Sequence, residues 1–197
     1  MGLVKPRRKS KRTDAAGHRV IDPVYSLTIS AAAGLVLFHG AWQKWQQHEA
    51  FAAAVQDYEL IPDVAVPSAS RALIVTEAAI GLALLWPRSH PWALLAGIAL
   101  LVIVTAAVVL NLLRGRTAIS CGCGGSGSEQ QISWALVMRN GLFAVLLGLA
   151  AQPWSDRTLI PLDYLTCLVG ALMLAGFNAV VGQLLSNQPR LDALRYR

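Results

Sequence analysis

The chain has 197 residues, of which 55% are hydrophobic and only 14% charged, and this is too little charge to cover a soluble globular domain. Its net charge of +6 at pH 7 reflects basic residues gathered near the N-terminus, and nothing else in the sequence resembles a nucleic-acid-binding module. Long uncharged windows alternate with short charged clusters, as is typical of helices that span a bilayer. The composition therefore favours an integral membrane protein.

Residues 1–22 form a basic tail in which seven Lys and Arg residues between positions 5 and 19 face the single acid Asp14. By the positive-inside rule this tail is predicted to be cytoplasmic. The apolar run that follows continues past the small residues 31–33 to Phe38. We therefore expect a retained membrane anchor rather than a cleaved signal peptide.

Hydropathy predicts an all-α, polytopic membrane helical bundle over residues 23–186, followed by a C-terminal tail at 187–197. It has four core helices and a fifth, and their expected ranges are 24–42, 71–86, 91–113, 132–151 and 162–185. The second is short, so an earlier start is considered. The second and fourth carry charges inside their apolar stretches, at Glu77 and Arg139.

Helix parity then predicts the side of each loop. With the N-terminus inside, the segments 43–70 and 114–131 lie outside the membrane, in the periplasm of a bacterium with this protein in its inner membrane. The C-terminal tail is also placed outside. Its arginines argue against that placement, so the side of the C-terminus stays open.

The outer segment 114–131 contains Cys121 and Cys123, separated by one glycine in a glycine-rich stretch. Two thiols one residue apart close only a small, strained disulfide ring, and strain makes such a bond suited to exchange. An inert disulfide and half of a metal site are the alternatives. A closed zinc site needs four ligands, and no second pair or histidine follows, so no metal is assigned. Cys167, in the fifth apolar segment, is interpreted as a small apolar residue.

The two charges inside helices are predicted to be partners. Glu77 and Arg139 lie at depths of about 9 and 10.5 Å from the outer helix ends at about 1.5 Å rise per residue. Each would be costly alone in hydrocarbon, so we expect an ion pair, with Asn111 and Asn140 completing a polar cluster. A structural pair is favoured over a proton relay. Gly81 is expected to let a neighbouring helix approach closely.

The outer end of the first helix holds His39, Trp42, Lys44 and Trp45. Aromatic residues with one cation are typical of the membrane interface. We expect these side chains to anchor the helix there, with Lys44 snorkelling to the surface.

Several short motifs resemble, in their order and helix placement, the methylamine utilisation MauE family of DoxX-like membrane proteins. They are His39-Gly-Ala-Trp-Gln-Lys44, Tyr58-Glu-Leu-Ile-Pro62, Glu77-Ala-Ala-Ile-Gly81, Cys121-Gly-Cys123-Gly and Arg139-Asn140. The chain departs from the family pattern at Gly124, where that pattern has an aromatic residue.

The resemblance implies an accessory protein that supports periplasmic maturation and disulfide formation of the methylamine dehydrogenase small subunit. It implies a thioredoxin-like periplasmic partner of the MauD type, with Cys121 and Cys123 as the exchange pair and Glu77 and Arg139 as the intramembrane polar positions. Whether the chain is itself an enzyme is left open.

Two other functional classes stay open beside this expectation. A quinone-linked membrane thiol oxidoreductase would make quinone a cofactor, but it needs a second redox carrier, and no cofactor-binding residue is assigned. A small-molecule transporter would show paired broken helices or an internal repeat, and the sequence has neither.

Overall fold

The computed structural model describes residues 22–86, 90–122, 131–152 and 157–195. Over these ranges the regular structure is helical, which confirms the predicted all-α membrane bundle. The helices are α1 (Pro23–Gln46), α2 (His48–Asp57), the 3-10 helix η1 (Asp63–Ala65), α3 (Val66–Leu84), α4 (His90–Leu113), α5 (Trp134–Ala150) and α6 (Pro161–Arg195).

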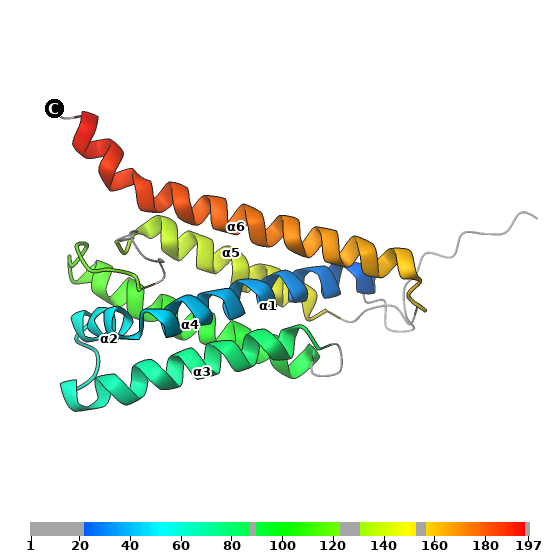
Figure 1. The fold of residues 1–197 in the computed structure, drawn as a ribbon, viewed down its shortest axis with the longest axis horizontal. Helices are drawn as coiled ribbons and strands as arrows, with labels where there is room; N and C mark the ends of the chain where they lie inside the picture. Colours follow the sequence, from blue (N-terminus) through cyan, green and yellow to red (C-terminus); the bar gives the residue numbers. More distant parts are fainter. Residues whose placement is uncertain (1–21, 87–89, 123–130, 153–156, 196–197) are drawn as a thin grey trace, which may run out of the picture.

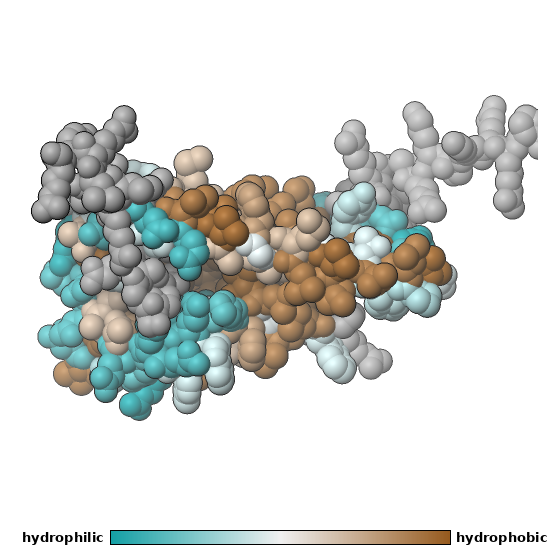
Figure 2. All heavy atoms as spheres, turned by 45° about the horizontal axis from the view of Figure 1, so that its top comes forward, coloured by the Kyte–Doolittle hydropathy of each residue, from teal (hydrophilic) through white to brown (hydrophobic). Residues whose placement is uncertain are grey.

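The five long helices lie side by side, and α1, α4 and α6 run in one direction while α3 and α5 run in the other (Figure 1). Both α2 and the segment that leads to Cys121 therefore lie at one end of the bundle, opposite Asp22. Four of these helices are long and apolar enough to cross a membrane, and α5 is a shorter apolar helix. In Figure 2 hydrophobic residues cover the middle of the visible face, and hydrophilic ones gather at the α2 end.

Polar side chains define where several helices begin. Asp22 caps α1 by accepting a hydrogen bond from the Val24 N–H at 3.0 Å, and Pro23 occupies the first helical position. Ser133 caps α5 in the same way by accepting from the Leu136 N–H. Arg157 pairs with Asp163 at 2.9 Å and with Asp22 at 3.4 Å, and so ties the start of α6 to the start of α1.

A pair of glycines sets the contact between α1 and α3. A Cβ atom at Gly81 would lie 2.8 Å from the backbone nitrogen of Phe38, and one at Gly34 would lie 2.8 Å from the Gly81 carbonyl oxygen. Neither backbone leaves room for a side chain. The close approach of a helix at Gly81 is therefore present, and α1 is the helix that makes it.

The apolar core of the bundle lies between α1, α3, α4 and α5. Its most buried members include Leu37, Leu84, Leu94 and Leu147. This core lies in the half of the bundle away from α2, because Leu84 ends α3 and Leu94 lies in the first turns of α4.

Some elements differ from the predicted ranges. The helix expected to start at residue 71 begins at Val66, and α6 continues to Arg195 through most of the expected C-terminal tail. Helix α2 was not predicted, because it is short and carries Glu49 and Asp57. It forms because Phe51 and Ala54 bury one of its faces against the bundle. The basic tail 1–21 lies outside the described residues.

Candidate functional site

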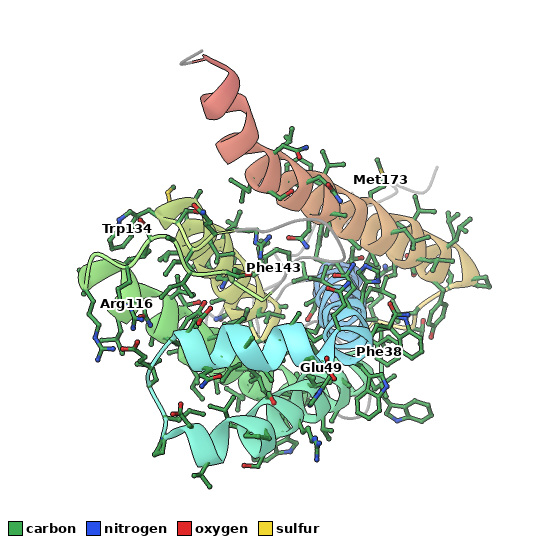
Figure 3. The ribbon with its side chains drawn as sticks, turned by 60° about the vertical axis from the view of Figure 1, so that its left-hand side comes forward. Phe38, Glu49, Arg116, Trp134, Phe143 and Met173 are labelled. Atoms are coloured by element: carbon green, nitrogen blue, oxygen red, sulfur yellow. The ribbon has the colours of Figure 1, made fainter. Side chains whose placement is uncertain are left out.

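A cavity of about 750 Å³ lies in the half of the bundle nearest α2, and residues of α2 and of all five long helices line it. Most of its wall is apolar, including Phe143 of α5, which Figure 3 labels. Its polar lining residues are His39, Gln43, Lys44, Tyr58, Glu77, Cys121, Arg139, Asn140, Asn178, Gln183 and Ser186. The cavity thus brings together four predicted site residues, namely Glu77, Cys121, Arg139 and Asn140.

The carboxylate of Glu77 forms an ion pair with the ammonium group of Lys44, and each side chain is only 11% exposed. Glu77 projects from α3 and Lys44 from the last turn of α1, so the pair joins the two helices. Gly40 leaves space for it, since a Cβ atom there would lie 3.1 Å from Glu77 Oε1. An ion pair this buried compensates two charges that would each be costly alone.

Two sequence-based predictions are corrected by this pair. Glu77 has Lys44 as its ion-pair partner in place of Arg139, and Lys44 is buried rather than snorkelling at the interface. Equal depth in the membrane was the basis for pairing Glu77 with Arg139. The partner depends also on how each helix is rotated, and α3 turns Glu77 towards α1.

Arg139 forms no ion pair within the described ranges. It is partly buried, and its guanidinium group lies beside α6, where a Cβ atom at Gly182 would be 3.6 Å from Nη1. Asn140, the next residue, is buried and lines the same cavity. Arg139 is therefore a cation of the cavity wall, directed towards α6.

The segment that carries the cysteine pair is joined at its two ends. The Ile132 N–H donates to the Ile119 carbonyl at 3.0 Å, and Ser120 and Gln131 form an antiparallel bridge. Cys121 is 7% exposed and packs in a cluster whose other buried members are Val108, Leu112, Ile119, Ile132 and Leu136. Cys123 lies outside the described residues.

Gly122, between the two cysteines, presses against α2. Its φ of +66° lies in the left-handed region that favours glycine, and a Cβ atom there would be 2.9 Å from the Phe51 ring. The Lys44 ammonium lies 5.4 Å from the centroid of the same ring. Phe51 therefore connects the cysteine segment to the buried ion pair.

Asn111 was expected to join the Glu77 cluster, and its side chain instead fastens α4 to the turn after α2. It is fully buried, and Nδ2 donates to the carbonyls of Tyr58 at 3.3 Å and Ala107 at 3.2 Å. Arg116 reinforces this contact through an ion pair with Glu59 at 2.7 Å.

Cys167 lies near the opposite end of the bundle, where its sulfur is 3.5 Å from the Val24 carbonyl at the start of α1. It is thus remote from the cysteine segment. Across the described residues, no group of three or more His, Cys, Asp or Glu side chains is placed to hold a metal ion.

The sequence reasoning missed two contributions to the cavity. Phe51 belongs to the helix that was not predicted, and its importance emerges only from the fold. Asn178, Gln183 and Ser186 of α6 also line the cavity. The sequence could have indicated these three residues, because they are polar residues inside an apolar run. Each is less than two helical turns from the next.

Comparison with known proteins agrees with the resemblance. The family described as Methylamine utilisation protein MauE matches residues 22–152. A protein named methylamine utilization protein MauE from Paracoccus denitrificans is 35% identical over 128 residues, covering 64% of this chain and 68% of its own.

Two further proteins with that name are similar. The one from Methylorubrum extorquens is 36% identical over 130 residues, covering 66% of this chain and 70% of its own. The one from Methylophilus methylotrophus is 30% identical over 165 residues, covering 79% and 83%. No solved structure matches the chain significantly.

Proposed function

The chain belongs to the MauE family of methylamine utilisation proteins, and we propose that it is a membrane accessory protein that supports maturation of the methylamine dehydrogenase small subunit. Maturation here means periplasmic disulfide formation, carried by exchange at Cys121 and Cys123. The observation that carries the proposal is the position of Cys121 and Gly122. Gly122 lies against Phe51 at the end of the bundle, so Cys121 is held beside the cavity rather than on a freely moving loop.

The chemistry is an exchange of one disulfide for two thiols. A thiolate of the reduced protein substrate attacks the Cys121–Cys123 disulfide, one sulfur of the pair leaves as a thiolate, and a mixed disulfide forms. The second substrate thiolate then resolves the mixed disulfide, so the substrate is oxidised and the pair is left reduced. A thioredoxin-like periplasmic partner in its disulfide form restores the pair by the same exchange in reverse.

The two cysteines have different roles in this proposal. Burial among aliphatic side chains limits access to Cys121 by another protein. We therefore assign the mixed disulfides to Cys123. Cys121 is the sulfur that leaves when the substrate thiolate attacks, and it is the thiol that resolves the mixed disulfide formed with the thioredoxin-like partner. The short range of a Cys-x-Cys pair keeps the resolving sulfur close.

A mixed-disulfide trap tests this assignment in cells that lack the native gene and express the full chain. In the Cys121→Ser variant a partner bound through Cys123 is no longer resolved, so a disulfide-linked complex that reductant cleaves should accumulate on non-reducing gels. The Cys123→Ser variant should give no such complex. Both variants should lose dehydrogenase maturation, measured as the level of oxidised small subunit.

Cys167→Ser is the matched control, because it removes a thiol of the same chain at the far end of the bundle. It should keep maturation and trap nothing. If both segment cysteines can be replaced while oxidised small subunit still accumulates, the exchange mechanism is wrong. A complex that accumulates only in Cys123→Ser would instead reverse the two roles.

A further inference from the structure

The cavity beside Cys121 changes character along its length, and three helices agree on the direction. In α1 the lining residues pass from Ala33 and Leu37 in the middle of the bundle to Gln43 and Lys44 at the α2 end. On α1 the lining is therefore apolar in the middle of the bundle and polar towards the α2 end. The lining residues of α2, α3 and α4 are apolar throughout, apart from Glu77.

Helices α5 and α6 repeat this order. In α5, Leu147 and Phe143 precede Arg139 on the way to the α2 end, and in α6, Leu172 precedes Gln183. A cavity with a polar end and an apolar end matches a molecule built the same way, with a polar head and an apolar body.

The charge of the polar end is positive. Lys44 and Glu77 compensate each other, which leaves Arg139 as a cation without an ion-pair partner in the part of the chain that the structure describes. Its side chain reaches the wall that α6 forms at Gly182, so its guanidinium group borders the cavity. An arginine held at membrane depth is stabilised by an anion, and carboxylate and phosphate oxygens fit its fork of donors.

The volume of the cavity is typical of a small-molecule site. About 750 Å³ lies within the range of roughly 300–1,000 Å³ that small-molecule sites occupy. This suits one apolar chain with a small head rather than a lipid with two full acyl chains. Residues of both α5 and α6 form the wall at its apolar end.

We propose that this cavity binds a single-chain anionic amphiphile, with its carboxylate or phosphate on Arg139 and its apolar chain along Phe143, Leu147 and Leu172. The site is separate from thiol exchange, because none of these residues takes part in that chemistry. Binding is therefore expected whether the cysteine pair is oxidised, reduced or replaced.

Photolabelling of the full chain tests the proposal directly. The protein is reconstituted in phosphatidylcholine vesicles with a palmitate analogue that carries a photoreactive diazirine near the end of its chain, and labelled peptides are mapped by mass spectrometry. Label should concentrate on the cavity face of α5, around the partly buried Phe143 and the fully buried Leu147. Met173 points away from the bundle in Figure 3 and is 72% exposed, so it reports non-specific labelling from the bilayer.

Competitors of equal chain length isolate the role of the charge. Oleate should displace the label and oleyl alcohol should not, since the two differ only in the head group. Displacement by oleyl lysophosphatidate in addition would identify a phosphate as an equally good head, and displacement by oleate alone would identify a carboxylate. Both results support the site. Equal displacement by oleyl alcohol would overturn it, as would label spread evenly over Met173 and the cavity face.

Variants locate the head group. Arg139→Gln should weaken labelling of the cavity face about tenfold or more, since it removes a charge-assisted hydrogen bond, whereas Arg139→Lys should keep most of it. Arg71→Gln is the matched control, because Arg71 is an exposed cation on α3 that does not line the cavity. Unchanged labelling in Arg139→Gln would overturn the proposal. The comparison of oleate with oleyl alcohol uses the unaltered chain, so it decides the matter even if a variant fails to fold.

Discussion

At the scale of single residues, Lys44 and Glu77 form the most buried ion pair of the described part of the chain. Both side chains are 11% exposed, and Gly40 has no side chain where the carboxylate lies. Removing one partner leaves the other buried without compensation. That cost is larger than the net contribution of the intact pair. Each single substitution should therefore destabilise the protein more than the double substitution does.

We predict that Glu77→Gln and Lys44→Met each lower the stability of the protein by about 3 kcal/mol, and that the double change recovers much of the loss. The reason is that the double variant buries neither charge alone. Thermal unfolding in neutral detergent, followed by circular dichroism for all four chains, measures the coupling energy.

The exposed ion pair of Arg116 and Glu59 provides the control, because it has similar geometry at 2.7 Å with side chains 33% and 69% exposed. Its cycle of glutamine substitutions should give a coupling of about 0–1 kcal/mol. Strictly additive losses of stability for Lys44 and Glu77 would show that the two side chains do not interact. A coupling of Glu77 to Arg139 that exceeds its coupling to Lys44 would restore the partner suggested by depth alone.

At the scale of elements, α2 is a support for the cysteine segment. It buries Phe51 and Ala54, and both side chains face the position of Gly122. The turn after α2 is fastened separately by the hydrogen bond from Asn111 to the Tyr58 carbonyl. The helix is thus held from two sides, and the segment that contains Cys121 rests on it.

Gly122→Ala should displace the segment from α2. The new methyl group would lie 2.9 Å from the Phe51 ring, and the φ of +66° adds about 1–2 kcal/mol of backbone strain for a residue with a side chain. We expect a loss of oxidised methylamine dehydrogenase small subunit. We also expect Cys121 to react faster with a maleimide after reduction.

Gly115→Ala separates strain from contact. Gly115 has a similar φ of +75°, but an added Cβ atom would meet nothing within 4 Å. This variant should therefore show the backbone strain with little loss of function. Equal loss in the two variants would indicate that contact with α2 does not position the segment.

At the scale of the whole molecule, the alternating direction of the five long helices divides the loops between two ends. Ser68, near the start of α3, lies at the end that carries α2 and Cys121, and Gln152 lies beyond α5 at the other end. Both residues are exposed. If the bundle spans the inner membrane with its α2 end in the periplasm, these positions lie on opposite sides.

Cysteine labelling should separate the two positions. In a chain without its native cysteines, a membrane-impermeant maleimide should label Ser68→Cys in intact spheroplasts, and Gln152→Cys only after the membrane is opened. The reverse pattern would invert the topology and place the exchange pair in the cytoplasm. Labelling of both positions in intact spheroplasts would mean that the chain does not span as a bundle of five helices.

The sequence by itself determined how many apolar helices there are, roughly where they lie, and that the Cys-Gly-Cys segment follows one of them. A bilayer makes these properties readable, because each crossing needs about 20 residues with few charges whatever the neighbouring helix is. The depth of a residue was less readable, because it was counted from expected helix starts at residues 71 and 132, whereas α3 begins at Val66 and α5 at Trp134. Glu77 therefore lies farther along its helix, and Arg139 less far, than the sequence suggested. The family resemblance was also readable from the sequence, because it rested on short motifs and their order along the chain.

Only the tertiary structure decided which residues meet. The rotation of α3 brings Glu77 to Lys44, and the glycines at 34 and 81 permit that rotation by letting two backbones touch. Helix α2 was unreadable because its ten residues form a stable helix only when Phe51 and Ala54 have a surface to bury against. Rotation and burial depend on partners far away in the chain, whereas hydropathy depends on each segment alone, and this is why the helices were predictable and their contacts were not.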